Sequence, residues 1–230
     1  GAQARFGEVY EAAFGSMIPK ATLEEGLRQI NSGPSLETMI ANNGGLNQQR
    51  IDGGMAALCE ALAADLGDVV RLGNAVTKIT HDETAVVTLA SGETIEARTV
   101  VSTLPPRLAV ALEYDPPLPQ WRRDVAEKVA PGNVIKAYLV YETPFWRERG
   151  LSGQSSSDEG AVRVTFDTTP ADSTRGLLMG FFEGNEADSL AHRSLETRRR
   201  AFVESAVRAF GAEAAEPIEY LERDWSAEQY

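Results

Sequence analysis

Lys136 is the residue whose surroundings most strongly suggest chemistry, because it is the one charged residue in the otherwise apolar segment 132–141. Taking an unpaired ammonium out of water costs several kcal/mol unless hydrogen bonds, a counter-charge or ordered water offset that cost. A buried lysine is therefore often functional. The alternative is an edge strand, on which the lysine stem lies along the sheet while the ammonium reaches water. The segment alone does not separate these two interpretations.

The other reactive residue types give little sign of a nucleophile or a metal. The sequence contains no G-x-G-x-x-G, P-loop, H-E-x-x-H or G-x-S-x-G motif. His81 and His192 are far apart in polar surroundings, so we expect both at the surface and predict no metal site. The single cysteine, Cys59, excludes an internal disulfide, and its helical spacing with Met55 and Leu62 predicts a packed thiol.

Composition and charge narrow the range of partners. The 230 residues are 43% apolar and 24% charged, which is typical of a folded chain of one or two domains. A net charge of −12 would repel a phosphate backbone, so we expect no nucleic-acid partner. The sequence has no apolar run of the ~18 residues that a membrane span needs and no signal sequence. The expected location is therefore cytoplasmic.

The first half of the sequence changes from helical to strand-like periodicity. Residues 1–40 look helical, and they end at a glycine-rich loop over residues 43–45. We then predict a helix over 55–66, strands over 69–72, 75–80 and 84–90, a hairpin turn at 91–92, and strands over 95–97 and 99–103. Pro105 and Pro106 end these strands because proline removes a ladder donor. Residues 50–115 thus form one small, strand-rich lobe.

The second half begins at the proline-rich connector 116–119. Beyond it we predict a helix over 121–129, strands over 133–141, 161–168 and 176–183, a helix over 195–210 and a last strand over 218–225. The expected fold class is α/β (α+β), with a mixed sheet flanked by helices. The sequence stops at Tyr230 without a polar tail, so we expect it to be a portion of a longer protein.

The order and spacing of several short motifs are similar to those of the flavin monoamine oxidase family, which includes FAD-dependent amine oxidases and L-amino-acid oxidases. The match covers about residues 43–230. Its segments are GGLNQQRIDGGM (44–55), STLPP (102–106), DPPLP (115–119), NVIK (133–136), PFWR (144–147), MGF (179–181) and DWSAEQY (224–230). Each motif is weak alone. Together they identify the chain as a central portion of such an oxidase.

This resemblance implies that the chain crosses between two domains. Residues 1–48 and 118–223 would belong to a substrate-binding domain, residues 49–117 to an inserted piece of the FAD-binding domain, and residues 224–230 to the return into it. Family members bind FAD chiefly through an N-terminal glycine fingerprint and a segment that comes after W-x-x-E-Q-Y. Neither lies within this sequence. We therefore expect incomplete FAD binding and little activity from this chain alone.

For the cofactor, the resemblance implies that Lys136 reaches flavin N5 through a water, which favours a functional lysine over the edge-strand alternative. It implies that Gly53 and Gly54 let the backbone approach the cofactor, although a helix-entry turn would also explain them. The other implied contacts are Val76 at the adenine end, Ser102, Thr103 and Pro105 near the nucleotide, and Trp225 beside the isoalloxazine ring. Packing alone would also account for these residues.

For the substrate, the resemblance places four residues on the cavity wall: Asn47, Val164, Phe166 and Phe181. Val164 is smaller than the aromatic residue of some animal relatives, so their substrate class is not carried over. The implied reaction removes a hydride equivalent from the carbon bearing the amine of a primary amine or L-amino acid. Imine hydrolysis and reoxidation by oxygen would come next, with release of hydrogen peroxide. No side chain stands out as a general base.

Two other functions remain open on the sequence. One is a flavin-free binding or interaction domain with the same fold, since fold does not establish function. The other is a related flavoenzyme with a non-amine substrate, of the desaturase-like or protoporphyrinogen-oxidase-like kind. Apolar surface left uncovered on the 49–117 lobe would favour self-association, which leaves a homodimer open.

Overall fold

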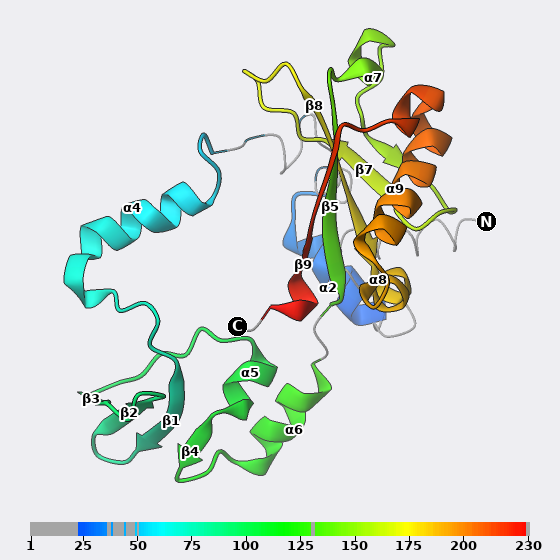
Figure 1. Cartoon of the computed structure of the whole chain (residues 1–230). Coiled ribbons are helices and arrows are strands. Elements are labelled where there is room, and N and C mark those ends of the chain that lie inside the picture. The colour runs from blue at the N-terminus through cyan, green and yellow to red at the C-terminus, as the bar shows by residue number, and fades with distance from the viewer. Residues whose placement is uncertain are drawn as a thin grey trace. The chain divides into compact units, whose positions relative to one another are not determined.

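The structure is a computed structural model that describes residues 23–35, 38, 44, 49, 51–129 and 132–228 (Figure 1). The chain divides into two compact units. The first consists of residues 1–49 and 132–229, and the second of residues 50–131 with Tyr230. Helix α6, Gln120–Lys128, falls within the second unit, whereas we expected residues 118–223 in the substrate domain. The functional assignment of the domains stays a prediction.

The first unit is built on a five-stranded antiparallel sheet with the order β6-β7-β8-β5-β9. Its strands are β5 (Val134–Tyr141), β6 (Ser155–Ser156), β7 (Val164–Asp167), β8 (Gly176–Glu183) and β9 (Glu219–Asp224). The strands predicted over 133–141, 161–168, 176–183 and 218–225 are confirmed. Because β5 pairs with β8 on one side and with β9 on the other, it lies in the interior of the sheet.

The helices of this unit with described bounds are α2 (Leu23–Ser32), α7 (Phe145–Glu148), α8 (Gly184–Ala191), α9 (Leu195–Phe210), η3 (Ala212–Ala215) and η4 (Trp225–Ala227). Helix α9 coincides with the predicted helix. Ser194 caps its first turn by accepting a hydrogen bond from the Thr197 N–H, at 3.2 Å. Gly211 comes after its last turn with a φ of +91°, a backbone conformation that favours glycine.

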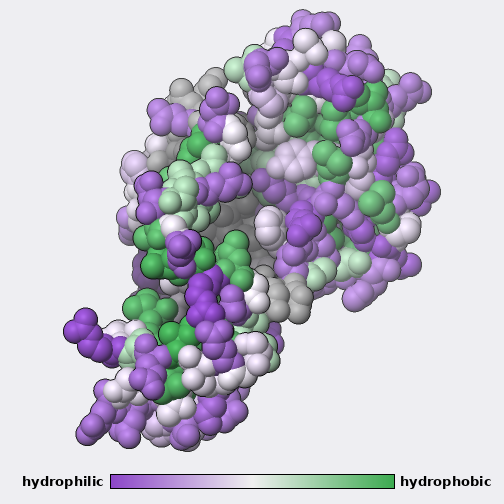
Figure 2. Space-filling view, turned by 60° about the vertical axis from the view of Figure 1, so that its left-hand side comes forward, coloured by the Kyte–Doolittle hydropathy of each residue, from purple (hydrophilic) through white to green (hydrophobic). Residues whose placement is uncertain are grey.

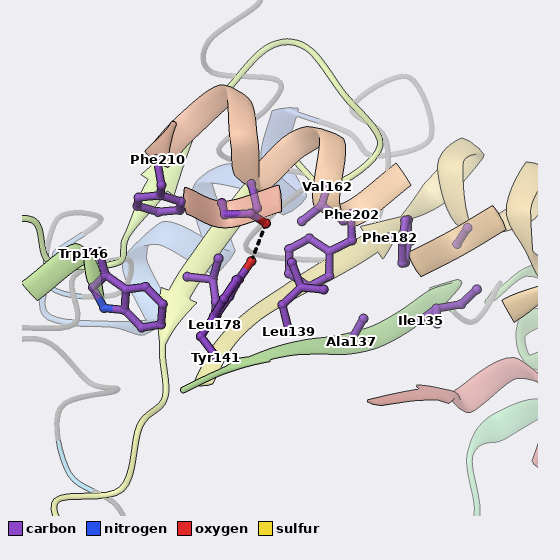
Figure 3. Close-up of a cluster of buried hydrophobic side chains, with 13 residues drawn as sticks. Ile135, Ala137, Leu139, Tyr141, Trp146, Val162, Leu178, Phe182, Phe202 and Phe210 are labelled. Carbon is purple, nitrogen blue, oxygen red and sulfur yellow. Dashed lines mark hydrogen bonds between the residues drawn. The ribbon is translucent and has the colours of Figure 1, made fainter. Parts of the chain in front are cut away.

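The main core lies between α9 and one face of the sheet (Figure 3). Side chains alternate along β5, so that Ile135, Ala137, Leu139 and Tyr141 are all buried in this core. Phe202 on α9 is fully buried against them, and burial of one such side chain contributes about 1.5–3 kcal/mol. The Tyr141 hydroxyl donates to the Ala214 carbonyl at 3.0 Å, the bond drawn in Figure 3. The alternation leaves Lys136 on the opposite face.

The second unit carries a four-stranded mixed sheet with the order β3-β2-β1-β4. Its elements are α4 (Ala56–Leu66), η2 (Gly67–Val69), β1 (Val76–His81), β2 (Ala85–Leu89), β3 (Thr94–Ala97), α5 (Pro106–Ala111), β4 (Glu113–Asp115) and α6. The predicted hairpin turn between β2 and β3 is confirmed, with Gly92 at a φ of +87°. The α/β fold class holds for the chain.

Two predicted strands of the second unit are wrong. Residues 69–72 form the end of η2 and a turn, and residues 99–103 have no regular structure. Both segments are rich in β-branched residues, but neither pairs with a described strand of the sheet. Strand propensity depends on a partner for the backbone and the side chains, so local composition is misleading in these segments.

Helix α4 exposes the apolar residues that we expected it to bury. None of its residues is buried, and Cys59 is exposed, so the predicted packed thiol is wrong. Leu58, Leu62 and Leu66 are 46%, 54% and 59% exposed. Hydrophobic side chains are visible at the surface in Figure 2. An apolar surface of this kind favours association with another apolar surface.

A clamp of hydrogen-bonded charges joins β9 to helices α8 and α9 of the first unit. Arg198 on α9 donates from Nε to both carboxylate oxygens of Glu222 on β9, at 2.9 and 2.8 Å. Its Nη1 also donates to the carbonyl of Leu190 at the end of α8, at 3.1 Å. The side chains of Arg198 and Glu222 are only 13% and 10% exposed, and the Tyr220 hydroxyl adds a third donor to Glu222. This pair therefore holds the edge strand β9 in register.

We expect Glu222→Gln to lower the free energy of unfolding at neutral pH by about 3 kcal/mol, because it leaves Arg198 buried without a counter-charge. Burial raises the pKa of Glu222, but hydrogen bonds from Arg198 and Tyr220 outweigh burial and lower that pKa below its ordinary 4.5. The pair therefore stabilises the fold fully at pH values above the ordinary pKa of a glutamate. This stabilisation disappears as the pH falls through the lowered pKa of Glu222. Urea unfolding at several pH values measures both effects.

The matched control is Glu196→Gln, which removes the exposed pair between Glu196 and Arg199 on the same helix. We expect this control to change stability by no more than about 0.5 kcal/mol. An equal loss in both variants would contradict a clamp at Glu222.

We expect the double substitution Leu58→Glu with Leu62→Glu to weaken self-association of the chain by roughly tenfold, because it removes exposed apolar surface from α4. Helical content should not change, since leucine and glutamate have similar helix propensities. Sedimentation velocity over a range of concentrations measures the association. Ala61→Glu with Ala64→Glu adds the same charge to exposed positions of the helix and serves as the control. Equal weakening by both pairs would mean that charge alone, and not the leucines, sets the association.

Candidate functional site

The candidate site of the first unit is the sheet face opposite the core. We call it the Lys136 face and define it as Lys136, Tyr138, Val164, Phe166, Met179 and Phe181. The register pairs Lys136 with Phe181 and Phe166 with Met179 across neighbouring strands. All six residues are half-buried. Three of the predicted substrate residues, Val164, Phe166 and Phe181, therefore share one face with Lys136. Asn47, the fourth, lies outside the described residues.

Two aromatic rings lie near the ammonium on this face. Lys136 Nζ lies 5.6 Å from the centre of the Tyr138 ring and 5.9 Å from that of Phe181. Phe181 in turn meets Phe166 edge to face, with 6.4 Å between ring centres and 70° between planes. Cation–π contacts of this kind stabilise an ammonium by about 0.5–2 kcal/mol. The rings thus hold the lysine without neutralising its charge.

Among the described residues, no carboxylate lies within 4 Å of Lys136 Nζ. The edge-strand explanation for this lysine is wrong, because β5 is hydrogen-bonded on both sides. An ammonium on the aromatic face of an interior strand does not add to the stability of the fold. The arrangement instead presents three N–H donors to a ligand with acceptor atoms.

Trp225 lies beyond the end of β9, next to the start of β5. The register pairs Lys136 with Arg223 and Ile135 with Asp224, so Trp225 comes directly after the residue opposite Ile135. It begins η4, a short helix in contact with β5, and its side chain is 57% exposed. The fold therefore leaves the indole available to a ligand at the end of the sheet that carries Lys136.

Sequence reasoning missed a carboxylate that fixes β7. The side chain of Asp167 is 9% exposed, and its Oδ2 accepts from Trp146 Nε1 at 2.9 Å and from Arg147 Nε at 2.6 Å. Its Oδ1 accepts from the Thr169 N–H at 2.9 Å. Burial raises the pKa of Asp167, but these hydrogen bonds outweigh burial and lower it. The network anchors the residue next to Phe166, and the PFWR motif was its only sequence signal.

The predicted glycines of the second unit form an open turn before α4. Gly53 and Gly54 have φ angles of +79° and +84°, which favour glycine over other residues. A Cβ on Gly54 would meet no atom within 4 Å, so the turn leaves room beside its backbone. Gly54 N–H donates to the Ile51 carbonyl at 2.9 Å. This geometry suits both a ligand-facing backbone and a plain helix-entry turn.

The remaining predicted nucleotide residues lie in two places of the second unit. Val76 is half-buried at the start of β1. Ser102, Thr103 and Pro105 are exposed in the loop between β3 and α5, where Pro105 directly precedes the first residue of that helix. The structure brings Ser102, Thr103 and Pro105 together on one loop, whereas their contact with a nucleotide stays a prediction.

Within the described ranges there is no group of three or more His, Cys, Asp or Glu side chains that could hold a metal ion. Among those same residues, no helix is both long enough and apolar enough to cross a membrane. His81 and His192 are exposed, as predicted.

We expect Lys136→Met to leave the free energy of unfolding unchanged or to raise it by up to about 1 kcal/mol, because it removes an ammonium from an aromatic face and nearly preserves volume. Urea unfolding measures this. Lys78→Met is the control. Lys78 on β1 pairs with Glu113 at 2.8 Å, so removing this pair should lower the free energy of unfolding slightly. A large loss of stability in Lys136→Met would instead assign this lysine a structural role.

Comparison with known proteins extends the resemblance seen in the motifs. A sequence model of flavin-containing amine oxidoreductases matches residues 5–230. AofH of Mycobacterium tuberculosis, described as a flavin-containing monoamine oxidase, is 36% identical over 203 residues, which cover 88% of this chain and 44% of that protein. Putrescine oxidase of Kocuria rosea is 36% identical over 194 residues, which cover 79% of this chain and 41% of that enzyme.

Among solved structures, wild-type putrescine oxidase bound to putrescine matches with a TM-score of 0.88 and 31% identity, over 100% of this chain and 52% of that chain. The chain thus spans about half the length of the relatives it matches. The family resemblance predicted from the motifs is confirmed. This chain belongs to the family of flavin-containing amine oxidoreductases.

Proposed function

We propose that this chain supplies the substrate-binding sheet of an FAD-dependent oxidase, which oxidises a primary amine to an imine and releases hydrogen peroxide with oxygen as the acceptor. The observation that carries the proposal is the Lys136 face, where an ammonium without a described carboxylate partner is held between aromatic rings on an interior strand. Family membership supports the flavin and the amine. A homodimer and a cytoplasmic location stay predictions.

The residues present fit a flavin in their chemistry. Lys136 offers N–H donors and a positive charge, which suit the nitrogen and carbonyl acceptors of an isoalloxazine ring. Trp225 offers an exposed aromatic surface, and the turn at Gly53 and Gly54 leaves backbone open to a ligand. We propose these four residues as flavin contacts, together with Val76, Ser102, Thr103 and Pro105. When bound, the flavin would accept the hydride equivalent from the substrate carbon.

The side chains of the Lys136 face would prepare the substrate for this step. Phe166, Phe181 and Val164 provide an apolar surface that excludes water, and an apolar surface favours the neutral form of an amine over its ammonium. The neutral amine has the lone pair that the oxidation needs. The positive charge of Lys136 further disfavours a protonated substrate nearby. We assign no general base among the described residues.

A monoamine fits the Lys136 face better than a diamine or an amino acid. The six residues that define it include no carboxylate, so the second ammonium of a diamine would lose water without gaining a counter-charge. An amino-acid carboxylate would need a second cation, because we assign Lys136 to the flavin. Arg223, the neighbour of Lys136 on β9, is already paired with Glu228 at 2.5 Å. We therefore propose an amine with an apolar or aromatic substituent as the substrate class, and L-amino acids as the less favoured one.

The test uses the intact protein loaded with FAD and an assay of hydrogen peroxide release. We expect kcat/KM for an arylalkyl monoamine to exceed kcat/KM for putrescine by at least about tenfold. The Lys136 face has no carboxylate among its six residues to offset the water that the second ammonium of putrescine loses. Val164→Glu adds a carboxylate to the Lys136 face. It should lower the ratio of kcat/KM for the monoamine to kcat/KM for putrescine.

A protein that takes up no FAD would refute the proposed oxidase and favour a flavin-free binding domain. Bound FAD without oxidation of any amine or amino acid would instead favour a flavoenzyme with a non-amine substrate.

A further inference from the structure

Asn133, the residue directly before β5, makes three hydrogen bonds to two other elements of the first unit, α8 and η4. Its carbonyl accepts from the Gly184 N–H at the start of α8, at 3.1 Å. Its side-chain Nδ2 donates to Asp188 Oδ1 in the middle of α8. Its Oδ1 accepts from the Ser226 hydroxyl in η4, at 3.3 Å. A half-buried amide thus ties the start of β5 to a helix on one side and to the Trp225 turn on the other.

The chemistry of these groups fixes the orientation of the Asn133 amide. An ionised aspartate can only accept hydrogen bonds, so the NH₂ group must point to Asp188. The amide oxygen is then left to accept from Ser226. Asn133 cannot be replaced by aspartate without placing two carboxylates against each other, so the site distinguishes two side chains of equal shape.

The turn that carries Trp225 has two further side-chain interactions of its own. Ser226 N–H donates to Asp224 Oδ1 at 2.9 Å, and Arg223 pairs with Glu228 across the turn. Both of these interactions lie within residues 223–228 and do not reach β5. The bond from Ser226 to Asn133 differs from them because it links the turn to the strand of Lys136.

We propose that Asn133, held by Asp188, is a positioning residue that keeps the Trp225 turn against the start of the Lys136 strand. The distance in sequence supports this role, since Asn133 is three residues before Lys136 and its partner Ser226 adjoins Trp225. The inference rests on the proposed function in so far as Lys136 and Trp225 contact a flavin. The hydrogen bonds of Asn133 themselves do not depend on a flavin.

The experiment exchanges the side chains of Asn133 and Asp188, which are the donor and the acceptor of one hydrogen bond. Asn133→Asp sets two carboxylates face to face, whereas Asp188→Asn keeps an acceptor for the Asn133 amide and should have little effect. The double variant Asn133→Asp with Asp188→Asn restores the bond with its polarity reversed. It leaves a carboxylate oxygen to accept from Ser226.

The first readout is the nanosecond mobility of Trp225, measured by time-resolved fluorescence anisotropy of this chain. A Trp121→Phe background leaves only two indoles, of which Trp146 is fully buried and hydrogen-bonded to Asp167. We expect the amplitude of the fast depolarisation to rise roughly twofold in Asn133→Asp. In the double variant it should return to the amplitude of the background protein. Unchanged mobility in Asn133→Asp, or no recovery in the double variant, overturns the proposal.

The second readout uses the intact protein loaded with FAD. We expect Asn133→Asp to lower kcat by roughly tenfold with little change in KM and to shift the visible absorption band of the bound flavin, with both effects reversed in the double variant. Loss of kcat without recovery would mark a purely structural residue and overturn the positioning role. A wild-type protein that takes up no FAD would refute the proposed function instead, and the anisotropy would still decide on Asn133.

Discussion

The alternation of side chains along β5 is the constraint on which the rest of the first unit depends. Because β5 is hydrogen-bonded on both edges, it cannot shift or twist away to relieve an unfavourable residue. Its odd-numbered positions from Ile135 to Tyr141 fill the core, so Lys136 and Tyr138 between them must face the other way. A shift of one residue would move Lys136 into the core and Leu139 out of it. The hydrophobic core therefore determines where the candidate site lies.

Two carboxylates fix other strands of the same sheet, one on β7 and one on β9. Asp167 fixes the end of β7 beside Phe166, and Glu222 fixes β9 to α8 and α9 through Arg198. Both accept at least three hydrogen bonds, which explains why the pKa of each is lowered despite burial. The polar groups of this unit are thus concentrated where strands need to be held. Neither carboxylate belongs to the Lys136 face, where three of the six residues that define it are aromatic: Tyr138, Phe166 and Phe181.

Periodicity in the sequence was sufficient to predict the elements that bury their side chains. Strands β5 and β8 and helix α9 occur where the sequence indicates them, because each packs in the core that its pattern anticipates. The prediction failed where a pattern lacked a partner, as for Cys59 on the exposed helix α4 and for residues 69–72. The roles of Asp167 and Asn133 depend on contacts between residues far apart in sequence, so the PFWR and NVIK motifs alone did not reveal them. Lys136 was found because a charge interrupts an apolar strand.

The position of Lys136 on an interior strand lowers the stability of the fold, and the fold tolerates this loss. The contacts of its ammonium with two aromatic rings offset part of the loss of water, and among the described residues no carboxylate offsets the rest. A methionine would fit the same sheet with less loss, so folding alone does not explain the lysine. The hydrogen-bonded Asn133 lies at the start of the same strand, where it also contacts the turn of an exposed tryptophan. A ligand with acceptor atoms and an aromatic ring would give both features a physical reason, and a flavin has both.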